Sequence, residues 1–367
     1  MNGLSIHDIC EPTLLLDETK CKNNINRVVS KAKSLGIQFR PHFKTHQSKE
    51  IGRWFQELGV EKIAVSSLKM AKYFAQAGWK DILIAFPLNL REFPETLLLT
   101  KHINLKLTIS DISSIEFLSN ILTFPIDIYL EVDVGYGRSG LPVDNFNLIT
   151  KALNLIKKSK FMNLIGLLSH NGKVYFCNSK DEVIEQHKIF LSKLLDLKNR
   201  LISEGFDLIL SVGDTPSVSI CDDFYGVDEL RPGNFVFYDV QQAYIGSCDF
   251  VDIAVCLAVP IVAIYPERSE LVCYGGAVHL SKEHLEIDDL RIYGLVVDLF
   301  DDSWSAPIEN SFVRLITQEH SVIKTTPQVI DRYKIGDLIG ILPIHSCLTA
   351  DAMKKYLIPN KGWLDHL

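Results

Sequence analysis

A basic cluster around one lysine is the densest group of reactive side chains in the sequence. The run Arg40-Pro41-His42-Phe43-Lys44-Thr45-His46 follows a stretch of apolar residues. A lysine amine attacks a carbonyl carbon only when it is uncharged, and desolvation or a nearby positive charge favours that form by lowering the pKa. We expect burial and Arg40 to act in this way on Lys44. Taken alone, a lysine at a strand end more often simply reaches solvent.

Three later segments place polar side chains beside glycines. Glu131–Gly140, EVDVGYGRSG, presents Arg138 from a turn that the glycines permit. Ser169–Tyr175, SHNGKVY, contains His170 and Tyr175. Ser211–Ser217 and Arg231–Asn234 come at the end of the series, where loops of barrel enzymes often bind phosphate through backbone N–H groups. The candidates there are Gly213, Thr215, Gly233 and Asn234, and we expect Tyr238 and Asp239 to close the site.

A possible metal pair lies near the end of the chain, in Pro343-Ile344-His345-Ser346-Cys347. In an extended segment residues two apart point the same way, so His345 and Cys347 are expected to bind one ion. An imidazole with a thiolate suits Zn²⁺, and two protein ligands leave positions for water and substrate. The competing interpretation is a buried cysteine beside a structural histidine.

The elements that position these residues alternate between short apolar runs and helical periodicity. Two long segments, Asp17–Leu35 and Asp181–Glu204, place apolar residues on one helical face. Eight strands are predicted at Ile37–Phe43, Lys62–Ser66, Asp81–Phe86, Lys106–Ser110, Asp127–Val132, Leu164–Ser169, Leu208–Val212 and Glu229–Phe237. Their number and spacing predict an α/β fold, a (β/α)8 TIM barrel, with an open doubly wound sheet as the alternative.

The pattern changes near Gln241, and we predict a barrel domain over residues 1–240 and a mostly β domain over 241–367. Strands are expected at Asp252–Tyr265, Glu270–Tyr274, Leu290–Leu299, Ser311–Thr325 and Asp337–Pro343, with little helix between them. Residues 1–12 are expected to pack with the second domain.

Composition limits the classes of partner. The net charge is −7 and the pI about 5.9, whereas nucleic-acid-binding proteins usually carry a basic face. The most apolar run, Ile253–Tyr265, is too short to span a bilayer, and no secretory signal is evident at the N-terminus. The eight cysteines include no CxxC pair, which favours the reduced cytoplasm.

Two motifs carry a family resemblance. Pro12–Asp17, PTLLLD, followed by RPHFKTH resembles the opening of the D-serine dehydratase and D-threonine aldolase family, in order over nearly the whole chain. The resemblance implies an alanine racemase-like barrel of fold type III with pyridoxal 5'-phosphate (PLP) bound to Lys44 as a Schiff base. It also implies that Arg138 approaches the cofactor ring, that His170 and Tyr175 line its face, and that His345 and Cys347 hold zinc.

The function that this resemblance implies is a PLP-dependent lyase for D-3-hydroxy amino acids, with D-serine dehydration to pyruvate and ammonia favoured. Cys347 leans toward the dehydratases, because the related aldolases tend to have aspartate there. The alternatives are retro-aldol cleavage of D-threonine to glycine and an aldehyde, amino-acid racemisation, and PLP binding without catalysis. The family also implies a homodimer.

Two departures from the family pattern leave the substrate open. Lys173 stands where the family commonly has histidine. His279 lies in a stretch where the family often has aspartate and lysine, both absent here.

Overall fold

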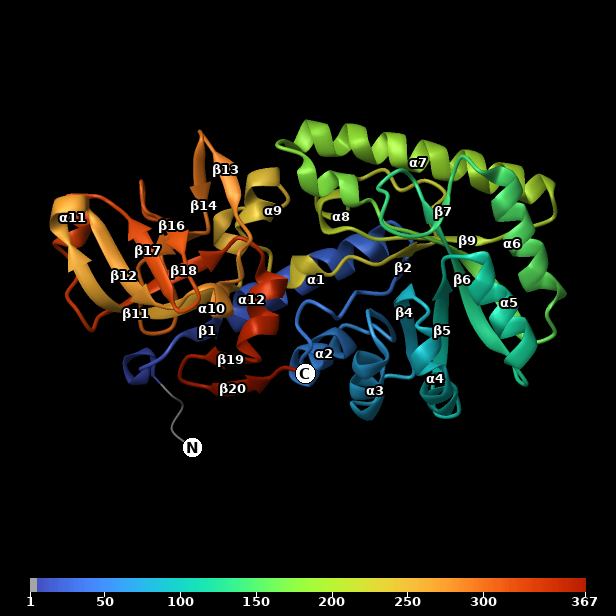
Figure 1. Ribbon diagram of the computed structural model, residues 1–367, viewed down its shortest axis with the longest axis horizontal. Coiled ribbons are helices and arrows are strands. Elements are labelled where there is room, and N and C mark those ends of the chain that lie inside the picture. Colours follow the sequence, from blue (N-terminus) through green and yellow to red (C-terminus); the bar gives the residue numbers. More distant parts are fainter. Residues whose placement is uncertain (1–4) are drawn as a thin grey trace. The chain divides into compact units, whose positions relative to one another are not determined.

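Eight parallel strands form a nearly closed barrel within residues 27–44 and 55–233, which make one compact unit of the chain (Figure 1). The computed structural model describes residues 5–367. Neighbouring strands follow the order β2-β10-β9-β8-β6-β5-β4-β3. Their bounds are β2 (Gln38–Phe39), β3 (Lys62–Val65), β4 (Asp81–Pro87), β5 (Asn104–Ile109), β6 (Ile126–Asp133), β8 (Met162–Ser169), β9 (Ile209–Val212) and β10 (Glu229–Leu230). A bridge between His42 and Ala64 joins the two ends of the order, which confirms the predicted barrel and excludes the open sheet.

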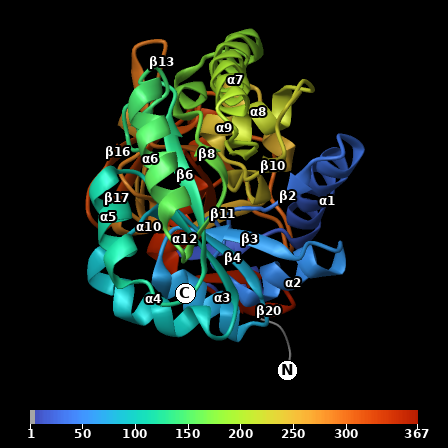
Figure 2. The same cartoon turned by 90° about the vertical axis from the view of Figure 1, so that its right-hand side faces the viewer.

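Helices surround these strands, as Figure 2 shows. The helices are α3 (Leu68–Gln76), α4 (Phe93–Thr100), α5 (Ile112–Ile121), α6 (Phe146–Lys158), α7 (Lys180–Ser203) and α8 (Thr215–Ile220). Two more, α1 (Glu18–Ser34) and α2 (Lys49–Glu57), each run across a boundary between the two compact units. The short strand β7 (Leu141–Pro142) pairs with the end of β6. This layering covers both faces of the parallel strands, which explains why the strands read as nearly continuous apolar runs.

The inside of the barrel changes from charged to apolar along its length. Where the strands begin, Arg40 donates to Glu229 at 2.7 Å and to Asp81 at 2.5 Å, and Lys106 contacts Asp81 at 3.0 Å. Ala64, Leu83, Tyr129 and Leu168 form a buried apolar cluster inside. Arg40 is therefore held by carboxylates at the base of the barrel. Its expected effect on Lys44 stays a prediction.

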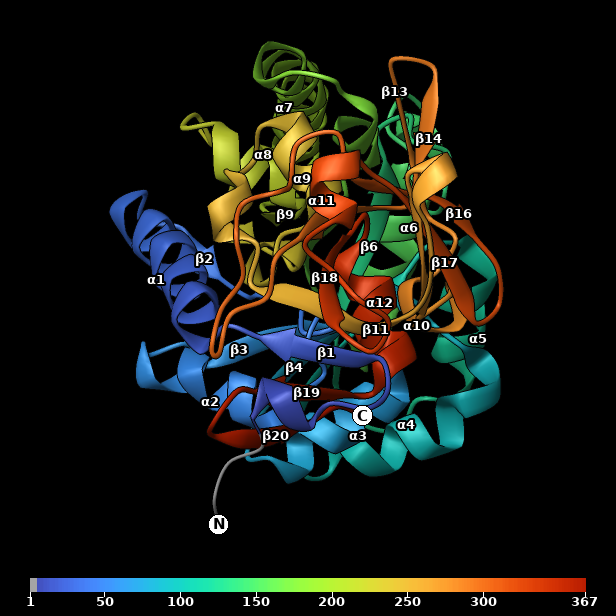
Figure 3. The same cartoon turned by 90° about the vertical axis from the view of Figure 1, so that its left-hand side faces the viewer.

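The second compact unit, residues 5–26, 45–54 and 234–367, is built on an antiparallel sheet (Figure 3). Its strand order is β12-β17-β16-β15-β18-β11-β1-β19-β20. The strands are β1 (Thr13–Leu16), β11 (Val255–Tyr265), β12 (Glu270–Tyr274), β15 (Gly294–Val297), β16 (Phe312–Ile316), β17 (His320–Lys324), β18 (Leu338–Pro343), β19 (Lys355–Ile358) and β20 (Gly362–Asp365). A separate hairpin consists of β13 (Leu285–Ile287) and β14 (Leu290–Ile292). Strand β1 pairs with β11 and β19, so the start of the chain belongs to this sheet.

Several predicted elements differ from the observed ones. The predicted first and eighth strands are much longer than β2 and β10, because Pro41 and Pro232 supply no N–H to a ladder and the chain turns after them. The mostly β second domain is confirmed, but it also contains four short helices that were not predicted. The short helices are α9 (Val240–Ile245), α10 (Ala277–Leu280), α11 (Pro327–Ile330) and α12 (Ser346–Met353). The predicted boundary at residue 240 remains a prediction, and residues 1–4 of the expected 1–12 segment lie outside the described residues.

Candidate functional site

Lys44 lies in a turn directly after the first barrel strand. Phe43 anchors this turn, because its ring packs against Phe55, Phe74 and Trp79 at centroid distances of 5.0–5.1 Å. The backbone N–H of Lys44 donates to Nδ1 of His42 at 3.3 Å. The Lys44 side chain is exposed in the chain alone, so the expected burial is not found.

Positive side chains converge on the two histidines nearest Lys44. Burial, followed by the charges of Lys44 and Arg231, holds the pKa of His42 well below its ordinary value. Burial, followed by the charge of Arg138, lowers the pKa of His170 to about 3. Both imidazoles are therefore neutral at physiological pH. These effects require proximity, so residues from four separate strand ends meet at one place. His42 and Arg231 were not among the predicted site residues, although both lie in motifs that the sequence analysis singled out.

Two carboxylates of β6 hold the loop that carries Arg138. Asp133 accepts the backbone N–H groups of Gly135, Tyr136 and Gly137 at 2.8–3.1 Å. Glu131 accepts the hydroxyl of Ser139 at 2.9 Å and that of Ser110 at 2.6 Å. This loop is therefore fixed on both sides of Arg138. The sequence analysis did not assign these carboxylates a role, although their alternate positions before a glycine turn are a signal that could have indicated it.

The ring of Tyr136 links Arg138 to His170. The guanidinium carbon of Arg138 lies 5.5 Å from the Tyr136 ring centroid, and the rings of Tyr136 and His170 are 6.0 Å apart. Gly172 leaves room for this ring, since a Cβ there would lie 2.3 Å from a Tyr136 ring atom. Residue 172 must therefore be glycine if Tyr136 is to remain in place.

The structure joins His170 and Tyr175 to the predicted phosphate loop. Nδ1 of His170 lies 2.5 Å from the carbonyl oxygen of Gly213. A carbonyl only accepts, so neutral His170 donates from Nδ1 and keeps a lone pair at Nε2. The backbone N–H of Thr215 donates to the Tyr175 hydroxyl at 3.1 Å, and the two rings of His170 and Tyr175 are 5.9 Å apart. Four predicted site residues thus form one connected group.

Arg231 contacts the loop that contains Gly213. Its guanidinium donates to Ser211 Oγ at 2.7 Å and to the Ser169 carbonyl at 2.8 Å, and burial lowers its pKa to about 10. A Cβ on Gly213 would lie 2.6 Å from the Arg231 carbonyl oxygen, so this position has no room for a side chain. Burial also raises the pKa of Asp214 to about 7, which reduces negative charge beside any bound phosphate.

The predicted phosphate contacts Gly233 and Asn234 lie on opposite sides of the boundary between the two units. The Asn234 side chain is directed to residues of its own unit. Its amide nitrogen lies 2.7 Å from Asp239 Oδ2, 3.0 Å from Ser346 Oγ and 3.5 Å from Cys347 Sγ. A phosphate contact by Asn234 remains a prediction, and it would have to come from the backbone.

The predicted metal pair lies at the start of a helix, so the extended-segment argument was wrong. His345 is the N-cap of α12, and Cys347 lies in its first turn. Nδ1 of His345 lies 3.9 Å from Asp239 Oδ2, and Thr45 Oγ1 lies 3.3 Å from Cys347 Sγ. Among residues 5–367, no three His, Cys, Asp or Glu side chains group as a metal site. A metal ion held by His345 and Cys347 would therefore have two ligands of these residue types.

The two departures from the family pattern occupy different surroundings. Lys173 is exposed, and its Nζ would lie 3.3 Å from a Cβ on Gly135, so it lies beside the Arg138 loop. His279 accepts the backbone N–H of Gly276 with Nδ1 at 3.2 Å, and its ring meets that of Tyr274. This pattern gives His279 a local structural role.

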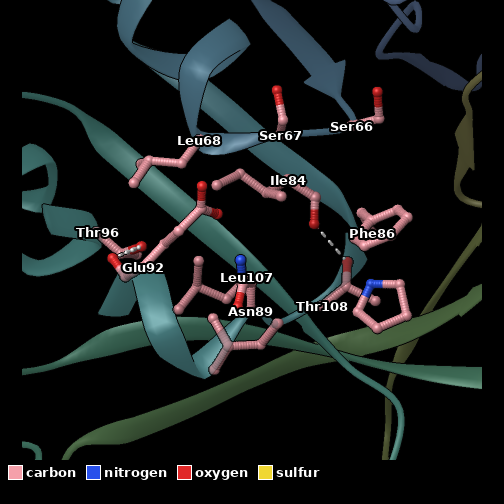
Figure 4. Close-up of a pocket in the computed structure, with 12 residues that line it drawn as sticks. Ser66, Ser67, Leu68, Ile84, Phe86, Asn89, Glu92, Thr96, Leu107 and Thr108 are labelled. Carbon is pink, nitrogen blue, oxygen red and sulfur yellow. Dashed lines mark hydrogen bonds between the residues drawn. The ribbon is translucent and has the colours of Figure 1, made fainter. Parts of the chain in front are cut away.

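A cavity of about 310 Å³ lies beside the ends of β3, β4 and β5 (Figure 4). Leu83 faces the barrel interior, so Ile84, which lines the cavity, faces the helices. The hydroxyls in its wall are used internally: Thr108 donates to the Ile84 carbonyl and Thr96 to that of Glu92, both shown dashed in Figure 4. The cavity therefore offers few free polar groups to hold an amino acid.

Comparison with known proteins identifies the class. Residues 16–240 match the family described as "Alanine racemase, N-terminal domain", and residues 254–359 match the "Putative serine dehydratase domain". The D-serine dehydratase of Dictyostelium discoideum is 30% identical, with 99% of each chain covered. The structure of D-threo-3-hydroxyaspartate dehydratase from Delftia sp. HT23 has a TM-score of 0.91 at 22% identity, covering 99% of each chain. A cysteine-to-alanine mutant of that dehydratase is described as being in the metal-free form, with a TM-score of 0.91, 22% identity and 99% of each chain covered.

The barrel is that of the alanine racemase-like class. This chain belongs to the alanine racemase N-terminal domain family and carries the serine dehydratase domain after the barrel. None of the helices in residues 5–367 is both long and apolar enough to cross a membrane.

Proposed function

We propose that the protein is a PLP-dependent lyase that converts D-serine to pyruvate and ammonia. The observation that carries this proposal is the meeting of Lys44, Arg138, Arg231 and two neutral histidines at the strand ends of the barrel. The similarity of the whole chain to the D-serine dehydratase of D. discoideum supports the substrate.

The charges at this place suit a phosphorylated, anionic cofactor. Lys44 would hold PLP as a Schiff base, with Arg138, His170 and Tyr175 around the ring. The loops at Gly213, Thr215, Gly233 and Asn234 would receive the phosphate through backbone N–H groups. The tight fit of Gly213 against the Arg231 carbonyl brings those two loops together. When bound, PLP supplies an electron sink that weakens the bonds to the substrate Cα.

The residues of the chain determine where protons move. The Lys44 amine is the group proposed to accept the proton from the substrate Cα. Neutral His170 presents Nε2 as an acceptor because its Nδ1–H is used by Gly213. Arg138 and Arg231 keep a positive charge near the site and favour the substrate carboxylate. Loss of the 3-hydroxyl with this proton releases water, and hydrolysis then yields pyruvate and ammonia.

His345 and Cys347 would hold the metal, which we propose to be Zn²⁺. The donors fit, because an imidazole and a thiolate are both zinc ligands and the start of α12 favours an anionic sulfur. Zn²⁺ bound there supplies a Lewis acid for the 3-hydroxyl. Thr45, which contacts Cys347, is the residue that follows Lys44 in the chain. We also propose that the protein is cytoplasmic and that it forms a homodimer. Light scattering of the purified protein tests the homodimer.

Aldol cleavage is the second candidate, favoured by the similarity to the D-threonine aldolase of an Arthrobacter species, 25% identical over 62% of this chain. Incubation with D-serine and D-threonine, with and without Zn²⁺, separates the two activities. Keto acid with ammonia indicates dehydration, and glycine with an aldehyde indicates cleavage. Lys44→Ala is the control and should be inactive with both. Glycine as the main product would overturn the dehydratase proposal, and inversion of the amino acid at Cα that a chelator leaves unchanged would favour racemisation.

A further inference from the structure

The start of helix α12 is built on a fully buried carboxylate, Asp239. Its Oδ2 accepts the backbone N–H of Ser346 at 3.0 Å and the Ser346 hydroxyl at 3.2 Å. The same oxygen accepts the amide of Asn234 at 2.7 Å, and Oδ1 accepts the N–H of Gln242 at 3.0 Å. A buried carboxylate requires such donors, so Asp239 is held rigidly in one position.

Asp239 also faces His345. The distance from its Oδ2 to His345 Nδ1 is 3.9 Å, and the His345 side chain is 26% exposed while Asp239 is fully buried. A carboxylate on the Nδ1 side favours a proton on that nitrogen. The lone pair is then on Nε2, the nitrogen on the far side of the ring from the carboxylate.

One hydroxyl and one side-chain amide lie close to the sulfur of Cys347. Its Sγ lies 3.3 Å from Thr45 Oγ1 and 3.5 Å from Asn234 Nδ2, and the residue is buried. The Asn234 amide can only donate, and the hydroxyl can donate to a sulfur that carries negative charge. Hydrogen bonds to the charged form stabilise a thiolate relative to a thiol.

We propose that Asp239, Asn234 and Thr45 position the His345/Cys347 metal pair: Asp239 sets the orientation and tautomer of His345, while Asn234 and Thr45 stabilise the Cys347 thiolate. Residues that contact the ligands of a metal fix the orientation of those ligands, and the loss of such residues typically weakens metal binding about 10–100-fold. The inference rests on the proposed metal pair. It gives Asn234 a side-chain role that differs from phosphate binding.

The test is the affinity of the full-length protein for Zn²⁺, measured by competition with a chromophoric chelator. Asp239→Asn keeps the shape and removes the charge, and it should bind Zn²⁺ about 10–100-fold more weakly than the wild type. Thr45→Val removes one hydroxyl and should weaken binding roughly two- to tenfold, the value of one hydrogen bond. Thr13→Val, the same change at a buried site whose hydroxyl bonds Glu11, is the matched control and should bind normally.

The outcomes distinguish a failure of the proposed metal pair from a failure of the positioning roles. If the wild type and His345→Ala bind equally little Zn²⁺, the metal pair is wrong, and this inference falls with it. If the wild type binds Zn²⁺ tightly but both Asp239→Asn and Thr45→Val bind as well as the wild type, the positioning roles are overturned while the metal pair stands. Thermal unfolding of each apo variant shows whether it is folded. If Asp239→Asn is not folded, Zn²⁺ binding by Thr45→Val tests the positioning roles.

Discussion

The buried ion network at the base of the barrel allows a quantitative prediction. The Arg40 side chain is 1% exposed and donates to Glu229, which is 0% exposed. Burial opposes the charge of Arg40, yet Glu229 and Asp81 outweigh it and hold the arginine pKa above its ordinary value. In Arg40→Met, Asp81 still has Lys106, while Glu229 loses its direct ion pair and keeps the Ser211 hydroxyl and the nearby charge of Arg231. Removing one partner of a buried ion pair costs about 3–5 kcal/mol.

Urea denaturation followed by circular dichroism measures this loss, and Arg40 and Glu229 both belong to the barrel unit. The double variant Arg40→Met/Glu229→Leu removes both charges of the pair and should recover part of the stability, since apolar replacement of a buried pair is often neutral, while Arg231 loses the nearby charge of Glu229. A loss below about 1 kcal/mol in Arg40→Met, or no recovery in the double variant, would refute the assignment of a paired buried charge.

Three further predictions concern the site and its support. Gly213→Ala places a Cβ 2.6 Å from the Arg231 backbone oxygen and should cost about 1–3 kcal/mol together with weaker PLP binding; unchanged unfolding and PLP titration would contradict it. Gly172→Ala displaces Tyr136 from Arg138 and should weaken PLP binding roughly two- to fivefold, the value of one exposed cation–π contact, as measured by absorbance titration. Burial, then His366, lowers the pKa of His46 to about 3, so the folded state favours its neutral form and stability should fall with acidification below about pH 6.5, by up to ~1.4 kcal/mol per pH unit. His46→Asn, whose side chain can still accept the Ser48 N–H, should flatten that slope, and equal slopes in urea melts would argue against it.

The barrel could be predicted because its strands are apolar runs at regular spacing. Helices α1 and α7 were predicted within one residue at each end, since their apolar faces are long and periodic. The loops with Arg138, His170 and Gly213 were also found, because glycine beside a polar residue at a strand end is a local signal. Their connection through Tyr136 and the Gly213 carbonyl required the fold, since these contacts join separate strand ends.

The second unit was harder to predict because its sheet depends on distant segments. Strand β1 pairs with β11 and β19, more than 230 residues away along the chain, and nothing near residues 13–16 indicates these partners. Helix α12 was missed because its first turn depends on a carboxylate from Asp239, which donors from other segments hold in place. The side-chain partners of Arg40 and Asn234 were not predicted for the same reason: they are remote in the sequence.

The central claim is that Lys44 carries PLP. Reduction of the purified, PLP-loaded protein with borohydride fixes an imine as a stable amine, and peptide mass spectrometry then locates the modified lysine. A phosphopyridoxyl group is expected on the peptide containing Lys44, with no incorporation in Lys44→Ala. A modified lysine elsewhere, such as Lys173, or a wild type that takes up no PLP, would contradict it.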